Sequence, residues 1–514
     1  MASSYLSPGV YMEEVSSGSR PIEAVGTAVA AFVGFAERGP LHEPVLVTNW
    51  TQFKSNFGDF VEDYYLAHAV YGYFQNGGGV AYVVRVGGAA SNGSANGHAG
   101  SAALPHAELP GSGADGRPAL TISARAADAS DITIEVAPSS EEGDDTFKLI
   151  VKQGGQPVET FDNVTTKRGP NNVATVVRQQ SKLIVIEETK GKALTVPKAG
   201  EVALAAPPVA PEKIESSHYV GNSADRTGFG GLEAIDEVTM LSVPDLMAAY
   251  QKGALSEEDV KAVQLAMIAH CELMADRVAI LDTPPGLKAE DVKKWRMDVT
   301  GYDSKYAAMY WPWIKVADPV AGKQVFVPPS GHIAGIWARN DSSRGVHKAP
   351  ANEVIRGAVT LELNITKGEH DILNPIAVNC IRSFRGQGIR VWGARTLSSD
   401  PEWRYLNVRR LFNYVEKSIL QGTNWVVFEP NDPKLWDSVK RTVTMFLRRV
   451  WRDGALFGGT PAEAFFVKCD EENNPAENRD AGILTVEIGI SPVKPAEFVV
   501  FRISQFAEGA GLEE

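Results

Sequence analysis

Each end of this chain carries a short β-prone segment that a joint separates from the rest of the sequence. Near the C-terminal end, apolar residues alternate with other residue types over 484–490, and a Pro-bounded stretch at 492–495 leads to an apolar run at 498–503. Period-two alternation is typical of a half-buried strand. Because a lone strand or two-stranded ribbon is marginally stable in water, each segment must pair with a sheet. That sheet belongs either to the same chain or to a neighbouring subunit, and the second alternative builds a polymer.

The N-terminal segment has the same character. It covers residues 5–15 and is followed by a polar joint at 16–20 and by an apolar run at 27–35, which predicts a buried strand. If the arms pair with a neighbouring subunit, we expect the contacts to be made by apolar residues of both arms. These are Val10, Tyr11, Met12, Leu484, Val486, Ile488, Phe498 and Val500.

The size and charge of the chain limit what it can be. Its 514 residues are too many for one hydrophobic core, so we expect two to four domains. A net charge of −13 makes general nucleic-acid binding unexpected but leaves room for a local basic face. The first residues lack a signal-peptide pattern, and no stretch of about 18 apolar residues predicts a membrane span. Three cysteines far apart in sequence suit reduced thiols, so we expect a cytoplasmic site of assembly.

Composition divides the chain into six parts. Gly, Ala, Ser and Pro dominate 87–118, Ala and Pro dominate 203–211, and short alternating runs without a long helical pattern lie between these two linkers. This arrangement predicts a small all-β domain inserted into a larger fold. The expected parts are an N-terminal β arm and joint (1–25), a first part of the core (26–91), the inserted β-rich domain with its linkers (92–215), an α/β part of the core (216–375), a C-terminal part of the core (376–482) and a C-terminal β arm (483–514).

The period of the apolar residues changes at about residue 235. Strand patterns at 238–243, 278–282 and 306–316 alternate with helical patterns that begin at Ser256 and near 289. Ser256 precedes three acidic residues, which suits a helix N-terminus. Strand–helix–strand order implies right-handed crossovers. We therefore expect an α/β (α+β) multidomain fold with a mixed sheet, flanking helices, an inserted β domain and extended arms.

Two further helices have specific start signals. Asp400-Pro401 is expected to open one that ends at Gly422, and Asp432-Pro433 is expected to open another that ends near Asp453. A polar cap followed by Pro at the first helical position favours a helix start, because Pro needs no hydrogen bond there.

Candidate catalytic residues are few. The sequence has no phosphate-binding Walker loop, no Cys pair spaced for zinc and no His-Glu-x-x-His motif, so no cofactor or metal is expected. Asp282 ends a strand, where it either binds a ligand or is a cap or turn residue. His347 lies between cations, Ser330 lies two residues before His332, and Cys271 lies on an apolar helix face. Each of these has a structural alternative: a loop contact, a turn and a buried thiol. An α/β enzyme that uses Asp282 or His347 remains one hypothesis.

A basic face is the strongest binding feature. The 433–453 helix has an apolar side and a cationic side whose members are Lys440, Arg441, Arg448, Arg449 and Arg452. Such a face is either a solvated helix surface or a docking surface for an acidic protein partner, where charge sets register and orientation.

Several motifs together resemble the tail sheath proteins of contractile phages and of bacterial contractile injection systems. The resemblance covers about 1–91 and 230–505, and the 92–215 insertion carries none of its motifs. The matching strings are Ser-Pro-Gly-Val-Tyr at 7–11, the run at 25–34, Trp-Thr-Gln-Phe at 50–53, Val-Pro-Pro-Ser-Gly at 327–331, the run at 345–352, Val-Trp-Gly-Ala-Arg-Thr-Leu at 391–397, Phe-Glu-Pro-Asn-Asp at 428–432 and Pro-Ala-Glu-Phe at 495–498.

The resemblance implies a structural protein and not an enzyme. It implies stacked hexameric rings of this subunit around an inner tube, with baseplate and cap or terminator proteins as further partners. It also implies that the arms complete sheets in neighbouring subunits, that the basic helix face meets an acidic tube surface, and that the insertion lies on the outside of the particle. Contraction would drive the tube through a target membrane, without insertion of this subunit into the membrane and without direct contact to nucleic acid.

Two alternatives remain beside a sheath of an injection system. A contractile phage tail sheath has the same sequence features, and the particle either stays in the cytosol or is released. A surface-lattice protein is a third class, but it predicts a secretion signal.

Overall fold

The computed structural model describes residues 21–86, 106–110, 118–125, 132–140, 145–167, 169–187, 196–204, 214–320 and 322–502. Val10, Tyr11 and Met12 of the N-terminal arm lie outside these ranges. The chain divides into two compact units, which are described separately below. One consists of Ala28–Arg339 and Ala351–Ser398, and the other of Met1–Thr27, Asn340–Pro350 and Ser399–Glu514. The boundary expected at 376 therefore falls inside the first unit, because the strands that follow it belong to that unit's sheet.

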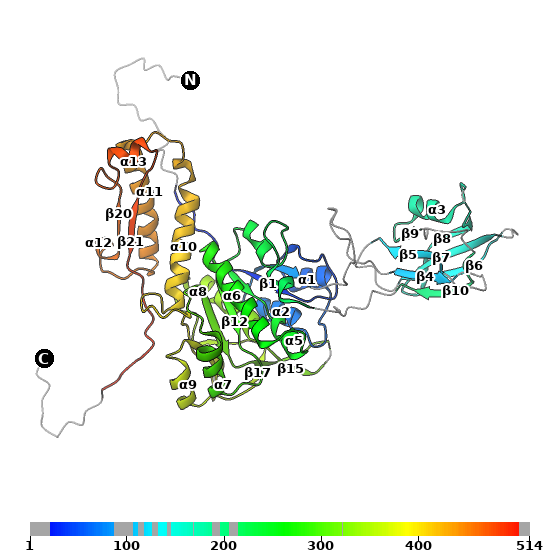
Figure 1. Ribbon diagram of the computed structural model, residues 1–514, viewed down its shortest axis with the longest axis horizontal. Helices are drawn as coiled ribbons and strands as arrows, with labels where there is room; N and C mark the ends of the chain where they lie inside the picture. Colours follow the sequence, from blue (N-terminus) through cyan, green and yellow to red (C-terminus); the bar gives the residue numbers. More distant parts are fainter. Residues whose placement is uncertain are drawn as a thin grey trace, which may run out of the picture. The chain divides into compact units, whose positions relative to one another are not determined.

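A nine-stranded mixed sheet forms the centre of the first unit (Figure 1). Its order is β16 (Glu353–Val354), β19 (Gly388–Val391), β18 (Val378–Phe384), β13 (Ala307–Trp311), β12 (Val278–Asp282), β11 (Met240–Ser242), β1 (Val29–Gly34), β3 (Val80–Arg85) and β2 (Pro44–Val47). The six strands from β18 to β3 are parallel, and antiparallel strands flank them at both edges. This arrangement confirms the predicted α/β core with a mixed sheet.

Helices cover both faces of this sheet. On one face, buried residues of α5 (Asp245–Gln251), α6 (Glu257–Met274), α7 (Ala289–Lys294) and α9 (Lys367–Leu373) form a single cluster with alternate sheet residues such as Ala31 and Val33. Phe32 points to the other face and contacts Tyr73 of α2 (Leu66–Asn76), with 5.4 Å between ring centroids. This unit also contains α1 (Trp50–Phe57), α4 (Ser216–Val220), most of α8 (Ser330–Arg344) and a three-stranded sheet of β14 (Ile314–Ala317), β15 (Gln324–Val327) and β17 (Ala358–Leu361).

Helix α6 forms as its sequence predicts. The Ser256 Oγ accepts from the Asp259 N–H, and the Asp259 carboxylate accepts from the Ser256 N–H at 2.9 Å, which gives a reciprocal capping box. The predicted apolar face is buried at Val260, Val263, Met267 and Cys271, with Met274 half-buried.

The insertion is β-rich but contains one helix. Two sheets share one core, β10 (Gly200–Ala203), β6 (Ile132–Pro138), β7 (Thr146–Gln153) and β8 (Gln156–Thr165) in one, and β4 (His106–Pro110), β5 (Pro118–Ala124) and β9 (Ile184–Glu187) in the other. The expectation of an all-β domain was wrong in one respect, because α3 (Val173–Gln180) also packs on this core. Asn172 caps α3 by accepting from the Thr175 N–H at 3.0 Å, and Val173 and Val177 are buried.

Helices α2 and α8 approach each other closely at two glycines of α8. A Cβ added to Gly335 would lie 2.4 Å from the Tyr73 carbonyl oxygen, which belongs to the backbone and cannot move aside alone. We expect Gly335→Ala to lower the free energy of unfolding by about 1–3 kcal/mol, despite the better helix propensity of Ala. Urea unfolding of both proteins measures the difference. Gly79→Ala is the control, because a Cβ there meets nothing within 4 Å. Equal stability of the two variants would contradict this packing argument.

The second unit is built on two helices that lie side by side, α10 (Leu406–Gly422) and α11 (Pro433–Arg452) (Figure 1). Helix α11 begins as predicted, with Asp432 accepting from the Leu435 N–H at 2.8 Å. The predicted start of α10 at Asp400-Pro401 was wrong. The Asp400 carboxylate accepts from the Glu402 N–H at 2.8 Å, so these residues form a local turn. The helix begins at Leu406 instead of Pro401.

A small hairpin completes this unit. Strand β20 (Phe465–Lys468) pairs with β21 (Glu487–Ile490) in an antiparallel two-stranded sheet. The short helix α12 (Pro461–Ala464) precedes β20, and α13 (Ala476–Asp480) lies between the two strands in sequence. Strand β21 is shorter than the pattern at 484–490 predicts. The second predicted strand, at 498–503, is not a strand over its described residues, 498–502.

Candidate functional site

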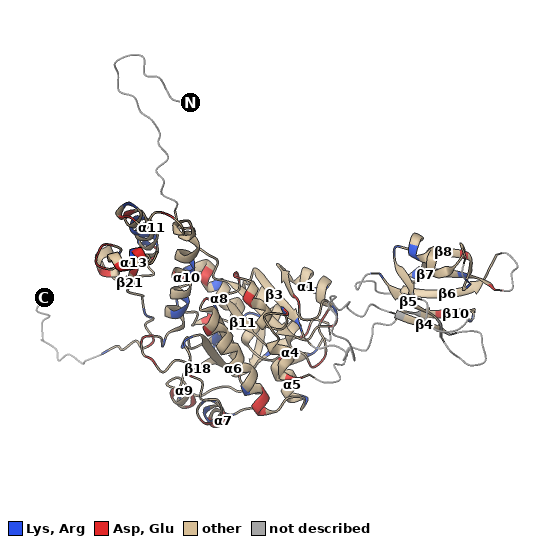
Figure 2. Ribbon diagram, turned by 45° about the horizontal axis from the view of Figure 1, so that its top comes forward, with Lys and Arg blue, Asp and Glu red and all other residues tan. Residues whose placement is uncertain are grey.

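Helix α11 has one buried and one cationic face. The buried face contributes to the core of the second unit and consists of Leu435, Trp436, Val439, Thr442, Val443, Phe446, Leu447 and Val450. All five residues predicted to form the binding face, Lys440, Arg441, Arg448, Arg449 and Arg452, are exposed. Figure 2 shows the Lys and Arg residues of this unit in blue on α10 and α11. This side of the helix therefore forms a positively charged surface.

The exposed cations of α11 are unpaired. In the part of the chain that the structure describes, no ion pair joins Lys440, Arg441, Arg448 or Arg452 to a carboxylate. Arg449 is the exception in having a contact, since its guanidinium bonds the Tyr414 hydroxyl and partly offsets the rise that burial causes in the Tyr414 pKa.

The arginines at positions 409 and 410 of helix α10 are buried and paired, in contrast to the exposed cations of α11. Arg410 is buried and donates to the Asp341 carboxylate at 2.9 Å and to the Thr27 carbonyl at 3.1 Å. Arg409 is also buried, donates to Asn413 and Glu416, and stacks on the Trp403 ring. Because arginines with a structural role are fully paired in this unit, the unpaired set on α11 is available for an external partner.

Met445 was missed by the sequence analysis. It lies four residues after Arg441 and three before Arg448, so helical spacing puts it on the cationic stripe, where it is 50% exposed. An exposed apolar side chain surrounded by arginines is the composition of a protein interface, with an apolar centre and a polar rim. The signal in the sequence is its helical spacing from Arg441 and Arg448, which a search for charged residues alone does not use.

The first part of the C-terminal arm packs within its own unit. Leu484, Val486 and Ile488 are half-buried against the same core as α11, and Ile488 is the cross-strand partner of Val467. No third strand joins this hairpin among the described residues, so its outer edges carry unpaired backbone groups.

The arm leaves the unit after residue 497. Up to that point it is anchored: the Asn407 amide donates to the Val493 carbonyl at 3.1 Å, and the Tyr405 hydroxyl donates to Glu497 at 3.1 Å. The next four residues are large, apolar and mostly exposed, at 73% for Phe498, 68% for Val499, 77% for Val500 and 83% for Phe501. Four consecutive exposed apolar side chains indicate a missing partner.

The N-terminal segment is anchored on helix α10, as is the C-terminal arm through Asn407. The Val25 N–H donates to Ser418 at 3.3 Å, the Thr27 hydroxyl donates to Asp341 at 2.7 Å, and Ile22 is buried in the core of this unit. A Cβ on Gly422 would lie 2.6 Å from the Ile22 side chain, so α10 ends directly against this segment. Both arms therefore start from α10.

Asp282 has a structural role. It is buried, and its carboxylate accepts from both the backbone N–H of Ser330, at 3.0 Å, and the Ser330 hydroxyl. Ser330 is the first residue of α8, so Asp282 caps that helix. The Ser330 hydroxyl also lies 2.9 Å from the Ser242 hydroxyl. These contacts occupy the groups that a catalytic role for Asp282 or Ser330 requires.

Asp282 gives a pH-dependent stability prediction. Burial raises its pKa to about 7, although the two Ser330 hydrogen bonds lower it. A carboxyl whose pKa is higher in the folded state contributes stability that is complete below its unfolded pKa and is lost as the pH rises through the folded value. Asp282→Asn cannot titrate. The stability advantage of the natural protein over this variant should therefore narrow between pH 5 and 7, by up to about 1.4 kcal/mol per pH unit. Urea unfolding of both proteins at pH 5 and pH 7 measures this difference in unfolding free energy. If the difference is the same at both pH values, the pKa of Asp282 is not raised in the folded state.

The other catalytic candidates also have structural environments. Cys271 is buried on α6, where desolvation raises its pKa and disfavours the reactive thiolate. His332 is buried, and desolvation lowers its pKa to about 3. His347 accepts a hydrogen bond from Asn407 through its backbone carbonyl at 2.7 Å. The described residues contain no group of three or more His, Cys, Asp or Glu side chains that could hold a metal ion.

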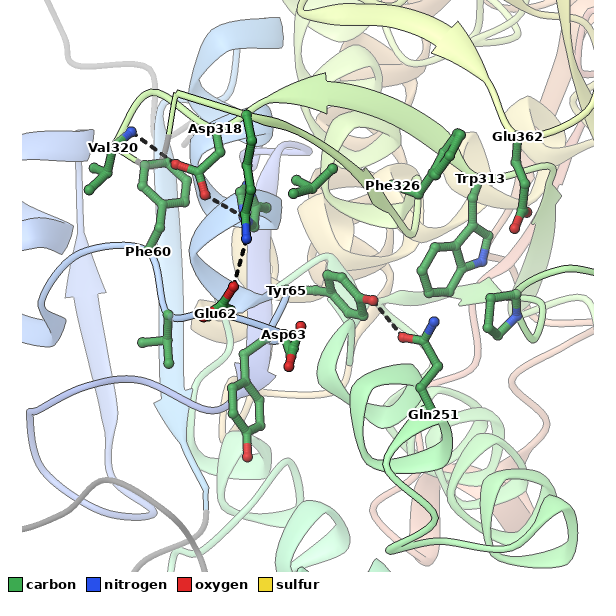
Figure 3. Close-up of a pocket in the computed structure, with 16 residues that line it drawn as sticks. Phe60, Glu62, Asp63, Tyr65, Gln251, Trp313, Asp318, Val320, Phe326 and Glu362 are labelled. Carbon is green, nitrogen blue, oxygen red and sulfur yellow. Dashed lines mark hydrogen bonds and ion pairs between the residues drawn. The ribbon is translucent and has the colours of Figure 1, made fainter.

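One pocket of about 440 Å³ lies in the first unit (Figure 3). Figure 3 shows Tyr65 and Gln251 pointing toward each other across it, with Trp313 and Glu362 on one side and Phe60 and Asp318 on the other. The Lys323 ammonium pairs with Glu62 at 2.6 Å. The lining combines acidic and basic side chains with aromatic rings and the hydroxyl groups of Tyr64 and Tyr65. Neither Asp282 nor His347, the two residues of the enzyme hypothesis, lines this pocket.

Among the described helices, none combines the length and the apolar composition that crossing a membrane requires.

Comparison with protein families gives two adjoining matches. The family described as phage tail sheath protein central domain matches residues 230–397, and the phage tail sheath C-terminal domain matches residues 398–506. The match to the tail sheath protein of Burkholderia phage BcepMu is 25% identical and covers 98% of this chain and 97% of that protein. The tail sheath protein of Salmonella phage ViI is 29% identical over 303 residues, 54% of this chain. The chain spans only 46% of that relative and 36% of the tail sheath protein of Vibrio phage KVP40.

Solved structures show the same fold. The helical sheath of the anti-feeding prophage (AFP) in its contracted state has a TM-score of 0.58 at 22% identity, with 98% of this chain and 100% of that chain covered. The sheath complex of the extracellular contractile injection system PVC, also contracted, has a TM-score of 0.57 at 22% identity and covers 99% of each chain.

Proposed function

Because this chain belongs to the tail sheath protein family, whose two domain models together cover more than half of its 514 residues, we propose that it is the structural subunit of a contractile sheath. The subunit polymerises as stacked hexameric rings around an inner tube and contracts to drive that tube through a target membrane. The observation that carries this proposal is the exposed apolar run at 498–501, which follows a two-stranded sheet with open edges.

The arms connect neighbouring subunits in this proposal. An extended segment that adds to a sheet edge supplies main-chain hydrogen bonds, and its alternate side chains enter pockets of the receiving sheet. Phe498 and Val500 from the C-terminal arm, together with Val10, Tyr11 and Met12 from the N-terminal arm, would pair with hairpins such as β20–β21 of other copies. Leu484, Val486 and Ile488 of the receiving copy would then lie next to the added strand.

The cationic face of α11 holds the sheath to the tube in this proposal. Lys440, Arg441, Arg448, Arg449 and Arg452 would meet acidic groups on the outer tube surface, with Met445 as the apolar centre. Such charge pairs set register and orientation more than they add affinity. They can therefore be released when rings widen during contraction.

The free energy for contraction is stored in the lattice. The extended state is held by the baseplate and by tube contacts, and each ring gains subunit contacts when it contracts. No nucleotide is required. A gain of a few kcal/mol per subunit makes the step irreversible, because about 1.4 kcal/mol changes an equilibrium tenfold.

Two kinds of particle fit this proposal. The tail sheath protein of phage BcepMu matches over 97% of its length, which favours a contractile phage tail, whereas the sheath structures of the same fold described above belong to AFP and PVC particles. Neighbouring genes separate the two: capsid and terminase genes indicate a phage, and an ATPase gene with a toxin gene indicates an injection system. The particle assembles in the cytosol and is then retained or released with its baseplate and cap.

Negative-stain electron microscopy tests the proposal. The purified protein is imaged alone and after co-expression with the neighbouring tube gene. We expect hollow helical cylinders. Monomers under both conditions, also after addition of baseplate proteins, would contradict the sheath function.

A further inference from the structure

Two arginines oppose each other at one edge of the nine-stranded sheet. Arg382 of β18 and Arg390 of β19 are direct cross-strand partners in an antiparallel hairpin. Direct partners project from the same face of a sheet, and two like charges in this position destabilise it. The hairpin therefore contains two like charges at directly opposed positions.

The two side chains differ in their contacts. The Arg390 guanidinium donates to the Asn352 carbonyl at 3.0 Å and to the Gln387 carbonyl at 3.1 Å. Arg382 makes no hydrogen bond or ion pair with any described residue, and its Nε atom is buried without a partner. Burying an unsatisfied donor of a charged group is unfavourable. The Arg382 guanidinium therefore has an unsatisfied hydrogen-bond donor in the isolated subunit.

Aromatic rings lie beside this pair. The Arg382 guanidinium lies 5.3 Å from the centre of the Phe384 ring, and Phe384 contacts Trp392 with 4.5 Å between ring centroids. Trp392 is 37% exposed. We call these four residues, Arg382, Arg390, Phe384 and Trp392, the arginine–aromatic face. Arginine and aromatic residues are enriched at the centres of protein interfaces.

We propose that the arginine–aromatic face binds exposed carboxylates of a second copy of this chain. The chain has 63 acidic and 50 basic residues, so the average surface of another copy is complementary to a cationic face. A carboxylate placed between the two guanidinium groups would offset the repulsion between them. The proposal rests on the sheath function, because only a homopolymer presents such copies in a fixed position.

Among the described residues, Arg382 has no hydrogen-bond or ion-pair partner, which makes the test specific. Arg382→Gln removes the repulsion without removing any hydrogen bond within the subunit. We expect its thermal midpoint to equal or exceed that of the natural subunit. We also expect the protein concentration for half-maximal cylinder formation to rise at least fivefold and to depend less on salt, because charged contacts are screened. A residue needed only for folding would lower the midpoint instead.

Two further variants serve as controls. Arg382→Lys keeps the charge but loses the planar guanidinium group. We therefore expect it to assemble better than Arg382→Gln but less well than the natural protein. Lys293→Gln removes an exposed cation from α7 of the same unit and should assemble normally. If the natural protein forms no cylinders, the sheath function fails and this proposal falls with it. If the natural protein and Arg382→Gln assemble alike, this proposal alone is overturned. Normal cylinders that lose another particle protein would assign the face to that protein and would also overturn it.

Discussion

A chain that ends after Glu497 is expected to stay folded and to form no cylinders. The removed residues that the structure describes, 498–502, form no hydrogen bond or ion pair with the rest of the described chain, and four of them expose apolar side chains. The anchor from Tyr405 to Glu497 remains in the shortened chain. In the polymer the same residues would bury their apolar surface and form main-chain hydrogen bonds with another copy, so their loss should abolish assembly.

Circular dichroism and electron microscopy measure the two parts of this result. The thermal midpoint should be unchanged, and negative-stain images should show single subunits. A chain that ends after Ser504 is the matched control, since it keeps the whole predicted strand at 498–503 and should still assemble. Full-length cylinders from the shorter chain would exclude strand exchange through this arm. Deletion of residues 1–20 is the equivalent experiment for Val10, Tyr11 and Met12.

Charge reversal on α11 is expected to separate the sheath from its tube. In Lys440→Glu, Arg441→Glu and Arg448→Glu combined, three unpaired cations would become acids facing an acidic partner. Since none of the three makes an ion pair within the subunit, folding and cylinder formation should be retained. We expect at least a tenfold loss of tube affinity, equivalent to about 1.4 kcal/mol.

Co-sedimentation of purified tube with the sheath protein measures that affinity, and microscopy shows whether extended particles form. The matched control reverses three exposed lysines of the first unit, Lys293, Lys294 and Lys367, and has the same net charge. Loss of tube binding in both triple variants would assign the effect to total charge. Normal tube binding by the α11 variant would show that the cationic face of α11 is only a solvated surface and does not bind the tube.

The sequence predicted what local patterns determine. The capped helices at Ser256 and Asp432, the buried strand at 29–34 and the two faces of α11 follow from spacing and end signals alone. The start of α10 was misplaced because Asp400 and Pro401 are equally suited to a turn, and only tertiary packing decides between them. Helix α3 was missed because its eight residues are too short to show a period.

The binding features divide in the same way. Exposure of the five α11 cations follows from helical spacing, whereas Met445 needed the spacing of an apolar residue among them. The Arg382–Arg390 pair depends on the register of a hairpin, which a shift of one residue would destroy. That no described residue forms an ion pair with Arg382 depends on the whole fold and has no signal in the linear sequence.

Both arms start from one helix, which determines how mechanical load passes through a subunit. A pull on the N-terminal arm reaches α10 through Val25 and Ser418, and a pull on the C-terminal arm reaches it through Glu497 and Tyr405. The 17 residues of α10 span about 25 Å, so tension between neighbouring copies would be carried along one short rod. All four residues of this path belong to the second unit, so a load carried along α10 would not pass through the strands of the nine-stranded sheet.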